Sequence, residues 1–253
     1  MDALRAAHSR RSVVALATRS RPRSAVGAVP AARLVKGDVE ELYDYDVLRS
    51  LTSPTMLIVR TSEPTFVLGG SQPLDVLDEQ RRQRVALRRR RGGGGVVLLQ
   101  PDDVWIDWWL PADDERWSSD VHVTSNRVGE WWRQVLAARL ESEVVLHQGA
   151  LEGDRAWRVA CFAGRGPGEV FVDGRKAVGV TQWRVREGVF VSSVLHAHPS
   201  TTLLDVLTDV PEGLVSALKH HTLKTLALDG DDVTSALVEL SHPVGVRQLF
   251  LIA

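Results

Sequence analysis

The feature that most constrains the fold is a series of short apolar segments between residues 143 and 196, each bounded by turn residues. Such runs, separated by Gly, Pro, Asn and Asp, are typical of β-strands. The dipeptide Asp173-Gly174 favours a two-residue hairpin turn, which makes the strands on either side antiparallel. The pattern therefore predicts an antiparallel sheet with strands at residues 144–147, 156–162, 169–172, 177–185 and 189–195.

Further strands precede this region, and one long helix separates them from it. The earlier strands are predicted at residues 56–60, 65–68, 96–99 and 104–110. Residues 120–140 predict the longest helix, because their apolar side chains recur on one side. The members of this apolar face are Val128, Trp131, Trp132, Val135 and Leu136.

Shorter helices are predicted near both ends of the sequence. One begins at Asp38, whose spacing to Glu41 matches a capping box, and another runs from Pro73 to about Gln83. Short helices also follow Thr202, before a final apolar strand at residues 248–252. Because the helices are segregated from the antiparallel strands, the fold class is α+β, with a mostly antiparallel sheet flanked by helices.

We expect residues 34–253 to form one domain. Residues 1–33 are rich in Arg, Ala and Ser and contain no aromatic side chain, so we expect a disordered amino terminus. The alternative for this segment is a mitochondrial transit peptide, which has a similar composition.

Charge and cysteine content narrow the cellular setting. The chain has 31 basic and 32 acidic residues, so its net charge of -1 gives no general attraction to nucleic acid or to an anionic membrane. Its single cysteine, Cys161, excludes an internal disulfide and favours a reducing compartment. No apolar run approaches the roughly 18 residues of a membrane span. These features predict a cytoplasmic protein with neither nucleic acid nor membrane as a partner.

Four consecutive arginines, residues 88–91, run directly into four glycines, residues 92–95. Guanidinium groups bind phosphate and carboxylate well, and glycine lets the backbone approach a ligand closely. The segment is not a P-loop, because no Gly-Lys-Ser or Gly-Lys-Thr follows and the next element is a strand. The alternative is a solvated loop without a ligand.

A second group of residues surrounds the hairpin turn. A loop rich in Gly and Pro follows Cys161 and ends at Glu169, and Lys176 comes just after the turn. A lysine ammonium in this place could pair with a carboxylate or phosphate, or polarise an acyl carbonyl. The alternatives are an exposed hairpin lysine and, for Cys161, a small buried apolar side chain.

Together the two motifs resemble the lipoate-protein ligase A and octanoyltransferase family, which shares its catalytic domain with biotin protein ligases. The family's Arg-Arg-x-x-Gly-Gly-Gly motif matches residues 89–95, and the small apolar pair after it matches Val96 and Val97. Its Gly-Arg-Lys-x-x-Gly turn matches residues 174–179, with Gln182 following in the next strand. The resemblance covers roughly residues 38–207 and implies that residues 34–253 form a single catalytic domain.

The cysteine-dependent octanoyltransferases of this family are similar without a gap from Cys161 to Gln182. This similarity implies that the Cys161 thiolate accepts an octanoyl or lipoyl group from acyl carrier protein and passes it to a lysine of a lipoyl domain. It implies that Lys176 holds the acyl carbonyl. The substrate-binding residues implied in the same way are Arg90, Gly93, Gly94, Gly95, Val96, Gly168, Glu169, Gly179 and Gln182.

Other activities stay open within the same resemblance. An ATP-dependent lipoate-protein ligase would use free lipoate or octanoate, with ATP and Mg, through an acyl-adenylate; no other cofactor and no resident metal is implied. Ligases usually have Asn-Asp where this chain has Gly168-Glu169, which favours the transferase. A biotin-ligase-like enzyme is disfavoured because no small C-terminal barrel is evident. A non-catalytic acyl-binding protein of the same fold is the third alternative.

Lys176 is expected to matter for function and little for stability. A lysine beside a hairpin turn makes few packing contacts, so the Lys176→Ala variant is expected to lose acyl transfer while its melting temperature stays nearly unchanged.

Overall fold

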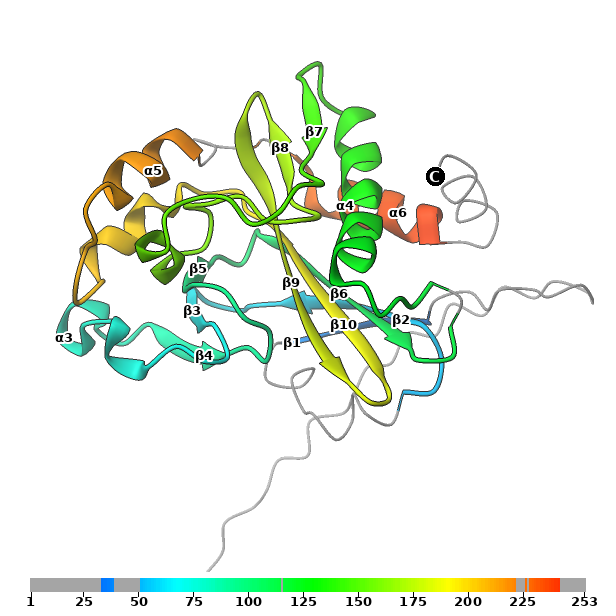
Figure 1. The fold of residues 1–253 in the computed structure, drawn as a ribbon, viewed down its shortest axis with the longest axis horizontal. Helices are drawn as coiled ribbons and strands as arrows, with labels where there is room; N and C mark the ends of the chain where they lie inside the picture. Colours follow the sequence, from blue (N-terminus) through cyan, green and yellow to red (C-terminus); the bar gives the residue numbers. More distant parts are fainter. Residues whose placement is uncertain (1–32, 39–50, 115, 222–225, 227, 242–253) are drawn as a thin grey trace, which may run out of the picture.

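The structure, a computed structural model, describes residues 33–38, 51–114, 116–221, 226 and 228–241 (Figure 1). Its larger sheet has seven strands in the order β1-β2-β6-β10-β9-β8-β7. β1 pairs in parallel with β2, and all other neighbours are antiparallel. These strands are β1 (Arg33–Asp38), β2 (Thr55–Arg60), β6 (Val104–Pro111), β7 (Val144–Leu146), β8 (Val170–Val172), β9 (Arg175–Val185) and β10 (Gly188–Leu195).

A smaller sheet of three strands lies against one face of the larger one. Its order is β4 (Ala86–Arg89), β3 (Thr65–Leu68) and β5 (Val97–Leu99), and β3 is parallel to β4 but antiparallel to β5. Buried apolar side chains from both sheets form one cluster between them. Its members include Leu57, Val59, Trp105, Trp109 and Phe190 from the large sheet, and Val67, Val97 and Leu99 from the small one.

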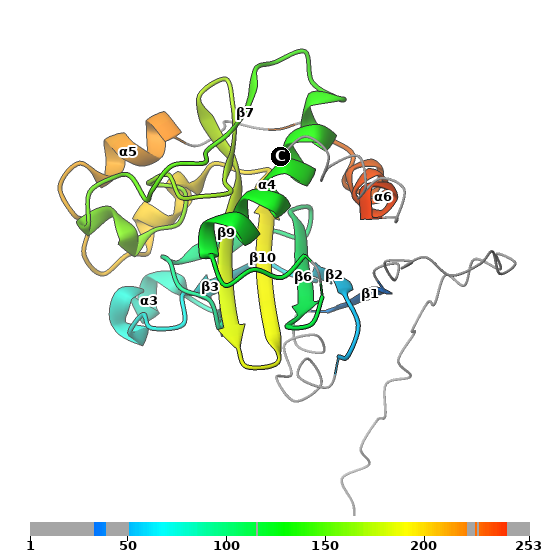
Figure 2. The same cartoon turned by 45° about the vertical axis from the view of Figure 1, so that its right-hand side comes forward.

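Helices cover the two outer faces of this pair of sheets. Helix α4 (Val121–Ala137) and helix α6 (Gly230–Ser241) pack on the large sheet, and in Figure 2 α4 crosses in front of β9 and β10. On the small sheet lie α5 (Leu214–His221) and the 3-10 helices η2 (Ala156–Val159) and η3 (Ser200–Asp205). The remaining elements are η1 (Leu74–Val76) and α3 (Glu79–Arg82).

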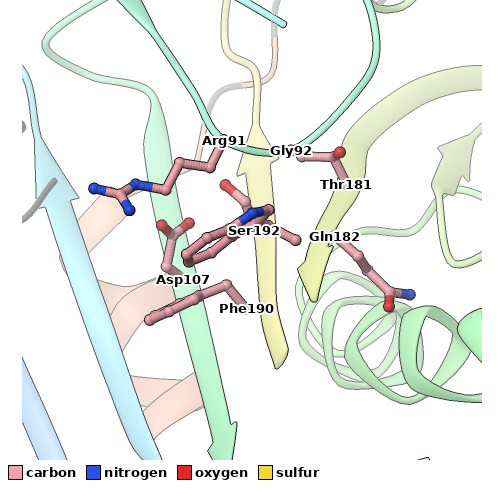
Figure 3. Close-up of a pocket in the computed structure, with 8 residues that line it drawn as sticks. Arg91, Gly92, Asp107, Thr181, Gln182, Phe190 and Ser192 are labelled. Atoms are coloured by element: carbon pink, nitrogen blue, oxygen red, sulfur yellow. The ribbon is translucent and has the colours of Figure 1, made fainter. Parts of the chain in front are cut away.

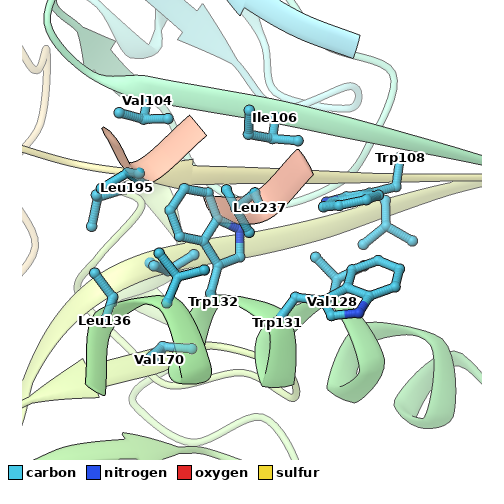
Figure 4. Close-up of a cluster of buried hydrophobic side chains, with 14 of the residues drawn as sticks. Val104, Ile106, Trp108, Val128, Trp131, Trp132, Leu136, Val170, Leu195 and Leu237 are labelled. Atoms are coloured by element: carbon cyan, nitrogen blue, oxygen red, sulfur yellow. The ribbon is translucent and has the colours of Figure 1, made fainter. Parts of the chain in front are cut away.

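The main core lies between α4 and the large sheet. Trp108 on β6 stacks against Trp131 on α4, with ring centroids 4.1 Å apart, and Leu237 of α6 packs on the same cluster (Figure 4). Trp132 is fully buried, and its Nε1 donates a hydrogen bond to the Ser193 hydroxyl, 2.8 Å away. The helix is thereby fixed to β10 by a polar contact as well as by apolar packing.

The α+β class with a mostly antiparallel sheet is confirmed, and most of the predicted strands are present within a residue or two. The predicted helix of residues 120–140 is also confirmed as α4. The helix predicted from Pro73 to Gln83 is interrupted, since Leu77 and Asp78 are extended between η1 and α3. Asp38 is the last residue of β1, and the rest of the helix predicted there lies outside the described residues, as do residues 1–32 and the predicted strand 248–252.

The strand predicted at residues 156–162 is wrong. Asp154 accepts a hydrogen bond from the Ala156 N–H, which starts the 3-10 helix η2 instead. Trp157, Val159 and Ala160 then pack against the core formed with α5 and η3. The short apolar run that suggested a strand is therefore a tight helical turn followed by a buried loop.

Within the part of the chain that the structure describes, no helix combines the length and the apolar composition needed to cross a membrane.

The contact between α4 and β10 gives a prediction about stability. Replacing Trp132 by Ala removes a fully buried indole, so we expect the free energy of unfolding to fall by about 3–5 kcal/mol. The matched control is Val145→Ala on β7, whose side chain is 45% exposed and whose loss should change stability by less than about 0.5 kcal/mol. Chemical denaturation of both variants measures the difference; similar values would contradict this assignment of the core.

Candidate active site

A cavity of about 640 Å³ lies between the two sheets. Apolar side chains of both sheets line it, among them Val67, Val97, Leu99 and Val194. The loops named by the sequence motifs form its rim. Nine residues expected at the site line it: Arg90, Gly93, Gly94, Gly95, Cys161, Glu169, Lys176, Gly179 and Gln182. The cavity is large enough for an acyl chain or a small cofactor.

Arg90 is buried and organises the glycine loop from within. Its Nη2 donates to the carbonyl oxygens of Gly93 and Gly95, at 2.8 and 2.7 Å, and its Nε donates to Gly93 at 3.0 Å. Its Nη1 lies 3.4 Å from the carbonyl of Val67 on β3. These contacts engage the guanidinium with backbone oxygens, so Arg90 shapes the loop and is not an open fork for phosphate.

With the loop carbonyls turned toward Arg90, the N–H groups of Gly93, Gly94 and Gly95 donate to no protein group within the described chain. Gly94 has a φ of 97°, which side-chain-bearing residues rarely adopt. Successive unpaired N–H groups at the edge of a cavity are suited to bind an anionic oxygen. The loop can therefore accept the oxygen of a carbonyl, a tetrahedral intermediate or a phosphate.

Cys161 reaches the same end of the cavity from the turn after η2. Its Sγ lies 3.0 Å from the Gly95 carbonyl oxygen and 3.4 Å from Nη2 of Arg90. The next residue, Phe162, has a φ of 71°, an unfavourable value for a side-chain-bearing residue. The left-handed turn at Phe162 reverses the chain, so that the phenyl ring is buried while the thiol faces the cavity.

Lys176 lies just beyond the predicted hairpin turn, where Asp173 and Gly174 both have positive φ. The side chain is only 6% exposed, so the alternative of an exposed hairpin lysine is wrong. The nearly unchanged melting temperature expected of Lys176→Ala rested on few packing contacts, and this burial contradicts that premise. Its Nζ is 2.6 Å from Oε1 of Glu169 and 3.2 Å from the Gly164 carbonyl oxygen. An ammonium has three donors, which leaves one for a substrate oxygen in the cavity.

Glu169 supplies the charge that permits this burial. Burial raises the pKa of Glu169, against the lowering effects of the Lys176 ammonium and of the backbone N–H of Gly166. Oε2 of Glu169 accepts a hydrogen bond from that N–H at 2.6 Å. The pair therefore fixes the Gly/Pro-rich loop and the lysine together.

The other expected residues divide between the cavity and its supports. Gln182 donates to Ser125 and Val121 of α4, which ties β9 to the start of the helix. Gly179 leaves room for Phe162, whose ring would lie 3.3 Å from an added Cβ. Two expected residues do not line the cavity. Val96 is buried in the core under the small sheet, and Gly168 packs against the Ser125 backbone with a φ of 85°.

The sequence patterns did not indicate the polar group on the sheet beneath the cavity. Asp107 on β6 is 5% exposed, and its Oδ1 accepts a hydrogen bond from Nε1 of Trp105 at 2.6 Å. The same indole N–H lies 3.0 Å from the Ser192 hydroxyl. Burial raises the pKa of Asp107 to about 6, although the hydrogen bonds from Ser192 and Trp105 lower it. The sequence does contain one signal for this group, because Asp107 is the only acidic residue in an otherwise apolar predicted strand.

Among the residues that the structure describes, no group of three or more His, Cys, Asp or Glu side chains is placed to hold a metal ion.

Comparison with known proteins agrees with this arrangement. The sequence model of the family described as the lipoyl protein ligase A/B catalytic domain matches residues 39–224. A comparison with curated protein sequences gave no match.

Solved structures with the same fold include two lipoate protein ligases. The bipartite lipoate protein ligase of a Thermoplasma acidophilum lipoylation system aligns with a TM-score of 0.66 and 15% identity, over 87% of this chain and 83% of that chain. Lipoate-protein ligase A bound with ATP aligns with a TM-score of 0.61 and 15% identity, over 87% of this chain and 86% of that chain. A T. acidophilum structure with bound lipoic acid has a TM-score of 0.61 and 15% identity, over 82% of this chain and 78% of that chain.

The glycine loop generates a prediction with an internal control. A Cβ at Gly94 would lie 2.8 Å from Nη2 of Arg90, whereas a Cβ at Gly93 would meet nothing within 4 Å. We therefore expect Gly94→Ala to displace Arg90 and to weaken ligand binding at least tenfold, while Gly93→Ala binds normally. Calorimetric titration with octanoic acid measures both; equal affinities in the two variants would contradict the geometry.

The ion pair generates a second prediction. Lys176→Ala leaves Glu169 buried without its cation, so we expect a loss of about 3–5 kcal/mol in the free energy of unfolding at pH 7. The loss should shrink toward pH 4, because the raised pKa of Glu169 lets it take up a proton in the folded state. Denaturation of the variant across this pH range measures the effect.

The double variant Lys176→Met with Glu169→Gln separates stability from function. It removes both charges, so it should regain most of the stability lost in Lys176→Ala. A Lys176→Ala protein as stable as the wild type at pH 7 would show that the pair does not support the fold.

Proposed function

Because the chain belongs to the lipoyl protein ligase A/B catalytic-domain family, we propose that it transfers an octanoyl or lipoyl group to a lysine of a lipoyl domain through a thioester on Cys161. The observation that carries the proposal is the meeting of three chemical groups in one cavity. A thiol, a buried ammonium and unpaired backbone N–H groups surround the same space. These are the parts that acyl transfer to and from a thiol requires.

In the first step, the Cys161 thiolate attacks the carbonyl carbon of an acyl thioester carried by acyl carrier protein. The bond from this carbon to the carrier's sulfur breaks, and the carrier leaves as a thiol that takes the proton lost by Cys161. Nη2 of Arg90 donates a hydrogen bond to Sγ at 3.4 Å, which holds the sulfur beside the glycine loop. Lys176 and the N–H groups of the glycine loop stabilise the oxyanion that forms on the carbonyl oxygen.

In the second step, the neutral amine of the acceptor lysine attacks the Cys161 thioester. The carbon–sulfur bond breaks and an amide forms. The proton that the amine loses goes to the Cys161 sulfur, which becomes a thiol again. A thioester plus an amine gives an amide plus a thiol without ATP. The oxyanion donors serve both steps, since the carbonyl occupies the same place in each.

The acceptor domain and the lipoyl group in this proposal have counterparts among similar proteins. The T. acidophilum ligase was analysed together with its E2 lipoyl domain, and another structure of this fold holds lipoic acid. The proposed enzyme comprises residues 34–253 as one catalytic domain. A reducing compartment such as the cytoplasm suits it, because its nucleophile is the chain's only thiol.

ATP-dependent activation of free lipoate or octanoate is the second candidate. It is favoured by the similarity in fold to lipoate-protein ligase A bound with ATP. Lys176 and the glycine loop N–H groups also suit a phosphate, so the oxyanion donors do not separate the two reactions. Cys161 separates the two reactions, because its thiol has no role in a mechanism that passes through an acyl-adenylate.

Intact-mass analysis of the protein incubated with octanoyl-acyl carrier protein and no ATP tests the proposal. We expect one octanoyl adduct that hydroxylamine removes and that a lipoyl domain accepts. Cys161→Ala should carry no adduct. The double variant Lys176→Met with Glu169→Gln should form it roughly 10²–10³-fold more slowly, because it lacks an oxyanion donor.

A parallel incubation supplies free octanoate and ATP in place of the carrier. Octanoylation of the lipoyl domain by Cys161→Ala under these conditions, without an enzyme adduct in the first incubation, would replace the transferase by the ligase. Absence of lipoyl-domain modification in both incubations would leave a non-catalytic acyl-binding protein.

A further inference from the structure

The face of the large sheet beneath the cavity is organised in three successive rows of paired residues. The register of β9, β10 and β6 defines each row. The first row is Gly179, Val194 and Trp105; the second is Thr181, Ser192 and Asp107; the third is Trp183, Phe190 and Trp109. The second row is thus polar and lies between a row that borders the cavity and an aromatic row.

The acyl carbonyl is expected over the first row. Cε of Lys176 would lie 3.8 Å from a Cβ on Gly179, so the lysine side chain runs along β9 toward that residue. From Gly179 to Thr181 is two residues, or roughly 7 Å along the strand. An acyl chain of eight carbons that starts at Lys176 therefore reaches the second row with its last carbons.

The third row blocks further extension. The rings of Trp183 and Phe190 are stacked with centroids 5.6 Å apart, and Trp109 packs on the other side of Phe190 at 4.4 Å. Above them the glycine loop crosses β9, where the Thr181 hydroxyl donates to the Gly93 carbonyl at 3.0 Å. The end of the chain is thereby confined beside Ser192 and Asp107.

A small pocket of about 20 Å³ lies at this end, next to the main cavity. Its lining includes Asp107, Ser192, Phe190 and Arg91, and Figure 3 shows Arg91 and Gly92 of the crossing loop above Asp107. This volume holds about one water-sized group. A methyl group there would meet a buried carboxyl, whose desolvation it cannot offset.

Asp107 has bonding capacity left for such a group. Its Oδ1 accepts the bond from Trp105, and within the described residues no basic side chain forms an ion pair with it. The indole N–H and the Ser192 hydroxyl hold the carboxyl in a fixed place. A substrate group that donates a hydrogen bond would complete its coordination.

From this geometry we infer that the Asp107 pocket selects acyl groups that end in a neutral hydrogen-bond donor, such as a hydroxyl, over acyl groups that end in a methyl. The inference rests on the proposed acyl-binding function and refines its substrate class: the cavity accepts an octanoyl group, and an eight-carbon acyl group with a hydroxyl at its far end binds more tightly. A hydroxyl suits the pocket better than an ammonium, because the Arg91 guanidinium borders the same space.

Binding of free acids tests the inference without requiring thioester chemistry. Calorimetric titration of the full chain compares octanoic, 8-hydroxyoctanoic and 8-aminooctanoic acids. We expect the hydroxy acid to bind about tenfold more tightly than octanoic acid, since a hydrogen bond to a charged acceptor is worth at least that factor. The affinity for 8-aminooctanoic acid should be lower than the affinity for 8-hydroxyoctanoic acid.

Variants at Asp107 show whether the carboxyl is responsible. Asp107→Leu replaces a buried acid by an apolar side chain and leaves the Trp105 to Ser192 bond, so the protein should fold. In this variant octanoic acid should bind more tightly than the hydroxy acid. Asp107→Asn, which still accepts a hydrogen bond, should retain part of the preference for the hydroxy acid.

The results separate this inference from the proposed function. Equal affinities of the wild type for octanoic and 8-hydroxyoctanoic acids, or no binding of either, would overturn the selection by Asp107. An unchanged preference in Asp107→Leu would overturn it too. Failure of Cys161 to form a thioester would overturn the transferase instead, because these titrations give the same result with a Cys161→Ala protein.

Discussion

The hydrogen bonds of the buried Arg90 hold the two halves of the site together. One guanidinium reaches the carbonyls of Gly93 and Gly95, the backbone of β3 and the sulfur of Cys161. A buried cation is tolerated only where its donors are satisfied, and here backbone oxygens satisfy them. As a consequence, the loop carbonyls of Gly93 and Gly95 are engaged by the guanidinium, and the thiol lies beside the loop at the edge of the cavity. Within the four-arginine motif, Arg90 is the buried member and the one that organises the glycine loop.

The second constraint is electrostatic. Lys176 can be buried beside an apolar acyl site because Glu169 accompanies it, at 2.6 Å. Such pairs contribute little net stability, but removal of one partner is costly. The arrangement keeps a positive donor in a site of low polarity, where it interacts strongly with a developing oxyanion. The Glu169 carboxylate also links the loop after Cys161 to the hairpin that carries Lys176.

Much of this fold follows from local patterns. The Asp173-Gly174 turn, the apolar face of α4 and the strand at Val104 are each determined by neighbouring residues, so the sequence predicted them. The two motifs also predicted nine residues of the cavity, since each motif is continuous in the chain. The 3-10 helix after Asp154 was not predicted, because its run of apolar residues resembles the sequence of a buried strand.

Other features depend on contacts between distant segments. The burial of Lys176 requires Glu169 and Gly164, and the parallel pairing of β4 with β3 joins segments some twenty residues apart. The Asp107 pocket needs three strands in register beneath a crossing loop. These contacts join segments far apart in the sequence, so no local pattern specifies them; for the Asp107 pocket, the sequence offers only one acidic residue within an apolar strand.

In the proposed mechanism, one acyl carbonyl lies between Cys161, Lys176 and the glycine loop. A crystal structure of the protein alkylated by a chloromethyl ketone with an octyl chain tests this most directly, because the product is a stable analogue of the thioester. The carbonyl oxygen is predicted within hydrogen-bonding distance of Nζ of Lys176 and of a loop N–H from Gly93 to Gly95, with the chain between the sheets toward Ser192. Alkylation of Cys161 with the ketone oxygen turned away from Lys176, or the chain outside the cavity, would contradict it.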